Sequence, residues 1–82
     1  MKYYIVTKVI NDGWVSDYLP IGITTDYETA VKCMYAGADD VEKEYSDYDF
    51  ERSNFDNYIF FDLDSSNGWW LEIKIDESEE IK

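Results

Sequence analysis

The alternation of apolar and polar residues in the last third of the chain predicts two β-strands. Residues 58–64, YIFFDLD, place Ile59, Phe61 and Leu63 on one face, and residues 69–76, WWLEIKID, are also apolar at every second position. A period of two is the pattern of a strand with one buried face. Because only a short polar loop separates the two segments, we expect them to form a hairpin.

The loop between these two strands determines which residues face each other. A two-residue loop at Asn67-Gly68 would place Leu63 opposite Glu72, and each apolar set would then face a polar one. A three-residue loop, Ser66-Asn67-Gly68, with Gly68 in the left-handed position of a bulge, pairs apolar residues with apolar residues. The predicted pairs are Leu63 with Leu71, Phe61 with Ile73, and Ile59 with Ile75.

The start of the chain predicts one further strand and a segment with two interpretations. Residues 3–10, YYIVTKVI, are β-branched and aromatic with an imperfect period of two, and a turn signal, Asn11-Asp12-Gly13, follows them. We expect a strand over residues 3–10. In residues 14–23, Pro20 and Gly22 interrupt the apolar residues, which is compatible with a short edge strand or with a loop.

A helix is expected in the middle of the chain. Thr25-Asp26-Tyr27-Glu28 matches a capping box with Thr25 as the N-cap. The apolar residues that follow are spaced by four and three, the period of an amphipathic helix: Tyr27, Val31, Met34, Ala38, Val41, Tyr45 and Tyr48. Gly37 interrupts this stripe at a cost of about 1 kcal/mol. We predict one helix over about 26–47, and the alternative is two helices, with Gly37 capping the first and the second starting at Asp39 or Asp40.

Together these elements predict a single α+β domain over residues 1–82. One long helix packs on one face of a small antiparallel sheet of three or four strands, and residues 77–82 are expected to fray. The other face of the sheet would then carry aromatic and charged side chains and is a candidate contact surface. Its expected members are Tyr58, Phe60, Asp62, Trp70, Glu72, Lys74 and Lys8.

Charge narrows the range of partners. Nineteen acidic and seven basic residues give a formal net charge of −12. Spread over a globule about 30 Å across, this is about one charge per 2.5 Å, against about one per 1.7 Å in duplex DNA. Nucleic acid and anionic membranes would repel such a chain, whereas a basic cleft would attract it.

No motif for catalysis or metal binding is recognisable. The chain has no histidine and a single cysteine, Cys33, which excludes the usual zinc sites and an internal disulfide. Residues 62–68 resemble the start of a calcium loop, but Asn67 replaces the required glycine and Ile73 the required glutamate. We expect no enzyme activity, no cofactor and no metal. Without a signal peptide or a membrane span, the expected location is a reducing cytoplasm.

The segment 44–58, EYSDYDFERSNFDNY, contains five carboxylates, five aromatic rings and one arginine. Crowded like charges oppose folding, so the segment indicates a use outside the fold. In nucleic acid, phosphates carry the charge and stacked bases supply the apolar rings. The predicted partner-binding residues are Asp39, Asp40, Glu44, Asp47, Tyr48, Asp49, Glu51, Asp56 and Trp70.

In size, acidity, lack of catalytic motifs and strand, helix, hairpin order, the chain resembles small phage-encoded inhibitors that imitate DNA. Anti-CRISPR proteins, anti-restriction proteins and uracil-DNA glycosylase inhibitors belong to this group, and anti-CRISPR proteins are the favoured match. The resemblance implies that the protein occupies the basic channel of a CRISPR effector such as Cas9 in a bacterial cytoplasm and blocks substrate binding. Two alternatives remain: an antitoxin or immunity protein that neutralises a basic nuclease, and a non-enzymatic structural interaction module.

Overall fold

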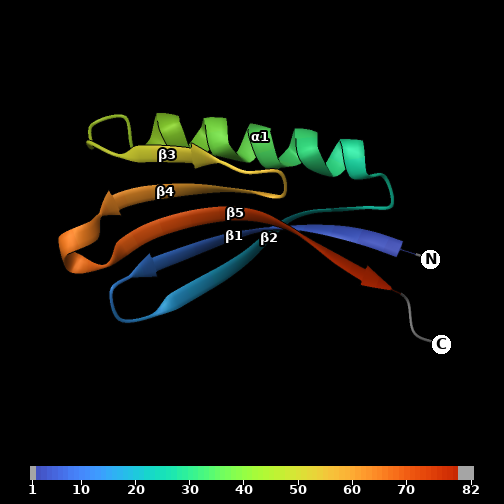
Figure 1. The fold of residues 1–82 in the computed structure, drawn as a ribbon, viewed down its shortest axis with the longest axis horizontal. Helices are drawn as coiled ribbons and strands as arrows, with labels where there is room; N and C mark the ends of the chain where they lie inside the picture. The colour runs from blue at the N-terminus through green and yellow to red at the C-terminus, as the bar shows by residue number, and fades with distance from the viewer. Residues whose placement is uncertain (1, 80–82) are drawn as a thin grey trace.

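The computed structural model describes residues 2–79, which form an α+β fold with one helix and five antiparallel strands. In chain order the elements are β1 (Lys2–Asp12), β2 (Ser16–Thr24), α1 (Tyr27–Glu44), β3 (Glu51–Asn54), β4 (Tyr58–Asp64), the short 3-10 helix η1 (Ser65–Asn67) and β5 (Trp69–Glu79). The strands form a single sheet in the order β2-β1-β5-β4-β3 (Figure 1). The last strand, β5, is therefore the centre of the sheet, between β1 and β4.

The first two strands form a hairpin around Gly13. Gly13 has a φ of 98°, a conformation that residues with a side chain rarely adopt. Residues 16–24 form an edge strand, which is one of the two structures that the sequence allowed. Pro20 is tolerated there because an edge strand has one side without a partner, and the pairing register shifts opposite it, between Val6 and Thr7.

The helix α1 is continuous through Gly37, as the apolar stripe predicted. The glycine has a packing role in this position. A Cβ atom there would lie 2.8 Å from Cδ1 of Ile21 and 3.2 Å from Cδ1 of Ile73. The missing side chain thus lets the helix approach the sheet closely, which offsets the lower helix propensity of glycine.

The start of the helix differs from the prediction by one residue. The N-cap is Asp26 and not Thr25, because the Asp26 carboxylate accepts hydrogen bonds from the Thr29 hydroxyl at 2.6 Å and from the Thr29 backbone N–H at 3.3 Å. These bonds, above all the one from the hydroxyl, hold the pKa of Asp26 below its ordinary value. A charged aspartate at this position also interacts favourably with the helix dipole.

The end of the helix was also predicted inaccurately. The helix ends at Glu44 with Tyr45 as the C-cap, before the predicted end near residue 47. After this point the chain turns, and the rings of Tyr45 and Tyr48 both pack edge-on against Trp69. Both tyrosines belong to the predicted apolar stripe. Tyr48, however, makes its contact from the turn that follows α1 and not from the helix.

The C-terminal hairpin is confirmed, but its predicted register is wrong by two residues. The observed pairs include Ile59 with Ile73, Phe61 with Leu71, and Asp62 with Trp70. The difference arises at the turn, where the pairing is irregular between Asp62 and Asp64 and η1 precedes Gly68. A shift of two residues keeps every side chain on its predicted face, so apolar residues still oppose apolar residues. Gly68 has the expected positive φ, 69°.

Two parts of the sheet were not predicted. β3 pairs with β4 at the edge, although its sequence, ERSN, has no alternation of apolar residues. β5 extends to Glu79, so residues 77–79 pair with the start of β1 and are not frayed. An ion pair of 3.3 Å between Lys2 and Glu77 joins the two strands there. Residues 80–82 of the predicted frayed tail lie outside the described residues.

The helix covers one face of the sheet and leaves the other open. The core between α1 and the sheet consists of Val6, Ala30, Met34, Ala38, Val41, Ile59, Phe61, Leu63, Leu71, Ile73 and Ile75. Lys8 was predicted on the open face, but its ammonium group lies 3.6 Å from the Glu44 carboxylate of α1. The other six residues predicted for the open face share it, because cross-strand partners point to the same side.

Candidate interaction surface

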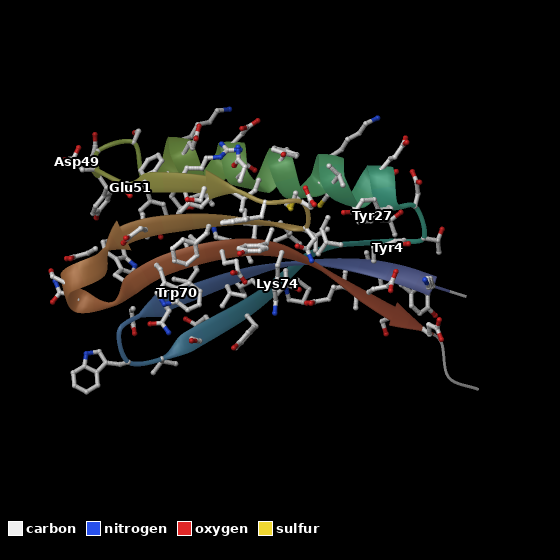
Figure 2. All side chains as sticks on the ribbon, in the orientation of Figure 1. Tyr4, Tyr27, Asp49, Glu51, Trp70 and Lys74 are labelled. Carbon is white, nitrogen blue, oxygen red and sulfur yellow. The ribbon has the colours of Figure 1, made fainter. Side chains whose placement is uncertain are left out.

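Four carboxylates gather where α1 ends and β4 turns towards β5. A hollow of about 450 Å³ at this place is lined by Tyr48, Asp49, Phe50, Glu51, Asp62, Leu63 and Asp64. Figure 2 shows Asp49 and Glu51 at this end of the molecule, far from Tyr4 and Tyr27. We call Asp49, Glu51, Asp62 and Asp64 the acidic end.

No ion pair among residues 2–79 neutralises the acidic end. The ion pairs in that range join other acids to the bases: Lys2 with Glu77, Lys8 with Glu44, Arg52 with Asp39 and Glu42, and Lys74 with Asp76. Within the acidic end, Glu51 lies directly opposite Asp62 in the pairing of β3 with β4. Like charges in this position are destabilising, so the fold keeps these carboxylates together against their repulsion.

Hydrogen bonds hold one of these carboxylates in place. The carboxylate of Asp64 accepts hydrogen bonds from the side-chain amide of Asn67 at 2.6 Å and from the hydroxyl of Ser66 at 2.7 Å. Both bonds stabilise the charged form, and they lower the pKa of Asp64 from its ordinary value. Asp64 is therefore ionised at neutral pH and has a defined position at the rim of the hollow.

Aromatic rings position the loop that leads into the acidic end. Tyr45, Tyr48 and Trp69 contact one another edge to face, with ring centroids 5.2 to 5.9 Å apart. Phe50 packs in the same manner on Phe61 at 5.6 Å. Such pairs contribute about 0.5–1.5 kcal/mol each beyond the burial of the rings. The main role of these aromatic residues is therefore to fix the position of the loop by packing within the fold, although Tyr48 remains 49% exposed.

The predicted partner-binding residues fall into separate groups. Asp47, Tyr48, Asp49 and Glu51 lie at or next to the acidic end. Asp56 lies in the turn at the other end of β3, where its backbone carbonyl accepts a hydrogen bond from the Tyr27 hydroxyl at 3.3 Å.

The remaining predicted residues lie on the helix and on the open face. Asp39 is 3.8 Å from Arg52, and Glu44 forms the ion pair with Lys8, so both carry partly compensated charge. Asp40 is exposed on the same helix. Trp70 lies on the open face of the sheet, where it is half-buried and directly opposite Asp62.

Asp62 and Asp64 are absent from the predicted partner-binding residues, although Asp62 was expected on the open face of the sheet. The alternation of β4 indicated that Asp62 points away from the core, but its closeness to Glu51 depends on the unpredicted strand β3. Asp64 stood in the rejected calcium loop, where its role is to accept bonds from the turn. For both residues, the sequence signal was a position on the polar face of the strand predicted over residues 58–64, which ends beside other acidic residues.

The molecule is elongated, so its net charge is spread over a greater length than a sphere would give. The principal extents are 44 × 24 × 18 Å, which makes the long axis greater than the roughly 30 Å expected for a spherical chain of this length. A net charge of −12 along 44 Å is about one charge per 3.7 Å. This is close to the spacing of about 3.4 Å per charge along one strand of DNA.

Glu51→Lys is expected to raise the stability of the fold. The lysine would face Asp62, so an opposite-charge pair worth about 0.2–1 kcal/mol would replace a repulsive one. Thermal unfolding should show an increase in Tm of a few degrees. Glu51→Gln, which only removes the repulsion, should give an intermediate Tm. A lower Tm for both variants would contradict the like-charge interpretation.

Among residues 2–79, no group of three or more acidic or cysteine side chains is arranged to hold a metal ion. No helix in this range is long and apolar enough to cross a membrane. No protein-family model, curated protein or solved structure matches the chain. Any proposal of function therefore rests on the surface itself.

Proposed function

We propose that this protein is a non-enzymatic inhibitor that imitates nucleic acid and occupies the basic DNA- or RNA-binding channel of a nucleic-acid-handling protein. The favoured partner is a CRISPR effector such as Cas9, which would make the chain a phage-encoded anti-CRISPR protein that acts in the host bacterial cytoplasm. The proposal assigns it no catalytic group, cofactor or metal. Its contact surface is centred on the acidic end.

The observation that carries the proposal is the uncompensated charge of the acidic end. Glu51 and Asp62 repel each other in the free protein, and no basic side chain among residues 2–79 pairs with either of them. Lysine or arginine side chains of a partner would replace this repulsion by attraction. The complex would thus gain an interaction that the free fold lacks, and association would be faster at low salt.

A fixed arrangement of charge suits inhibition better than a flexible acidic tail does. The rings of Tyr45, Tyr48 and Trp69 hold the loop before Asp49, and hydrogen bonds hold Asp64. A positioned set of carboxylates loses little conformational entropy on binding. The positively charged channel of a Cas9-type effector recognises its nucleic acid mainly through shape and backbone, which are the features that such a surface imitates.

A competition assay tests the proposal. An effector and guide RNA complex is mixed with labelled target DNA, and the protein is titrated at about 50 and 200 mM salt. We expect displacement of DNA at low salt. Direct measurement of the Kd between the protein and the effector should show weaker binding at the higher salt concentration.

Two results would count against the proposal. Undisturbed DNA binding at both salt concentrations would exclude this effector as the partner and favour a basic nuclease neutralised by an antitoxin or immunity protein. Binding to the effector that does not change with salt would indicate a contact dominated by apolar groups, as expected for a structural interaction module.

A further inference from the structure

The open face of the sheet contains two aromatic rings and two carboxylates in alternating positions. The register places Asp62 opposite Trp70 and Phe60 opposite Glu72. Residues two apart along a strand share a face, so Asp62 also neighbours Phe60, and Glu72 also neighbours Trp70. Each ring therefore has one carboxylate across the strands and another along its own strand. We call these four residues the aromatic-acid square.

The two rings of the square lie close together. The ring centroids of Phe60 and Trp70 are 5.7 Å apart, and the ring planes are inclined by 33°. Both side chains are half-buried and point away from α1. They provide an aromatic area over β4 and the central strand β5; Figure 2 shows Trp70 toward the end of the sheet where β4 turns into β5, and Lys74 nearer the middle.

Neither carboxylate of the square has a basic partner among residues 2–79. Lys74 lies two residues from Glu72 on the same face, but its ammonium group pairs with Asp76 at 3.7 Å. Burial is the main cause that raises the pKa of Glu72, although Lys74 acts in the opposite direction. Asp62 has another acid, Glu51, as its neighbour on β3. The square is thus a partly desolvated acidic site without its own cation.

We infer that the aromatic-acid square binds an arginine side chain of the partner. A guanidinium group is planar, stacks on aromatic rings and directs its N–H groups to carboxylates in its own plane. Phe60 and Trp70 supply the stacking surface, and Asp62 and Glu72 supply the acceptors. A lysine ammonium group would gain the charge attraction but only a small part of the stacking energy.

Charge distinguishes an arginine-bearing partner from other occupants of this face. A phosphate group would be repelled by both carboxylates of the square. A second copy of this chain would present the same excess of acid, since Glu51, Asp62, Glu72 and Asp76 share the face with one lysine, Lys74. The inference rests on the proposed function, because it names the chemistry of the basic partner.

Peptide binding tests this inference directly. Labelled peptides of equal length, one of arginines and one of lysines, are titrated with the full chain at low salt, and binding is followed by fluorescence anisotropy. We expect the wild-type protein to bind the arginine peptide about fivefold more tightly than the lysine peptide. Trp70→Leu should reduce this preference to about twofold or less.

Trp14→Leu is the matched control. Trp14 is 94% exposed in the turn between β1 and β2 and lies outside the square, so its replacement should leave the arginine preference unchanged. Circular dichroism establishes that each variant is folded. If Trp70→Leu does not fold, two other variants test the same site. Phe60→Leu removes the ring on the neighbouring strand β4, and Glu72→Gln removes the charge of one acceptor.

The outcomes separate this inference from the proposed function. Equal affinity of the wild-type protein for the two peptides would overturn the inference, as would an arginine preference that survives in the folded variants of the square. The proposed function would not be affected, since it requires only that basic peptides bind and that salt weakens their binding. Failure to bind either peptide would count against the proposed function itself.

Discussion

Reversing two carboxylates in the double variant Asp49→Lys/Glu51→Lys is expected to weaken binding to the proposed effector partner roughly 100-fold, about 3 kcal/mol. The change removes two attractive charges from the acidic end and puts two charges there that repel a basic channel. Both side chains are exposed and belong to no ion pair among the described residues, so the core is unaffected. The Kd for the effector, measured at low salt, and the concentration that displaces labelled DNA are the two readouts.

The matched control is Asp56→Lys/Glu79→Lys, which changes the net charge by the same amount at other places. Asp56 was among the predicted partner-binding residues, but it lies at the end of β3 away from the acidic end. Glu79 lies at the end of β5 away from the turn between β4 and β5. We expect this control to weaken binding only a few-fold, through the general reduction of charge. An equally large loss in the control would show that net charge, and not the acidic end, determines affinity.

Stability measurements separate loss of binding from loss of fold. Because Glu51→Lys would replace the repulsion with Asp62 by attraction, the double variant should be at least as stable as the wild-type protein. Higher stability with weaker binding is the result expected when a surface is maintained for its partner rather than for the fold. A double variant that is unfolded by circular dichroism would refute this account of the acidic end.

Gly13→Ala is expected to lower the free energy of unfolding by about 2–3 kcal/mol. Two effects add at this residue. Its φ of 98° is strained for any residue with a side chain, and a Cβ atom there would overlap the backbone carbonyl oxygen of Asn67. The turn between β1 and β2 and the turn between β4 and β5 would have to separate. Urea unfolding of the variant and the wild-type protein measures the difference.

Gly68→Ala is the control that separates the two effects. Gly68 also has a positive φ, 69°, but a Cβ atom there would make an ordinary contact of 3.6 Å with the Cα atom of Gly13. Only the backbone strain remains, which corresponds to about 1–2 kcal/mol. Equal losses in the two variants would show that the overlap with Asn67 costs nothing beyond the backbone strain.

The sequence predicts the helix and the faces of the C-terminal strands because periodic burial leaves a periodic pattern. It does not determine the hairpin register, since a shift of two residues satisfies the same alternation and only the irregularity between Asp62 and Asp64 selects one pairing. It also does not show on which side β1 presents Lys8. Val6 and Val9 are both buried but lie on opposite faces, so burial alone does not identify the helix side.

The strand β3 could not be predicted because its position depends on tertiary contacts. Arg52, in the middle of ERSN, lies over the ring of Phe61 at 5.7 Å and pairs with Glu42 at 2.7 Å. Glu42 and Phe61 can contact Arg52 only after α1 and β4 have taken their positions. The candidate site follows the same rule: local density of acids identified Asp49 and Glu51, whereas the pairing of β3 with β4 brings Asp62 to them.

The central position of β5 has a consequence for the order of events during synthesis. Before β5 leaves the ribosome, the only strand pairings open to the described chain are β1 with β2 and β3 with β4, and no strand joins them into one sheet. Trp69, the anchor of the loop before Asp49, is the first residue of that strand. A nascent chain that stops short of β5 would therefore display its acidic residues without their final geometry, and translation must pass residue 69 before the acidic end is assembled.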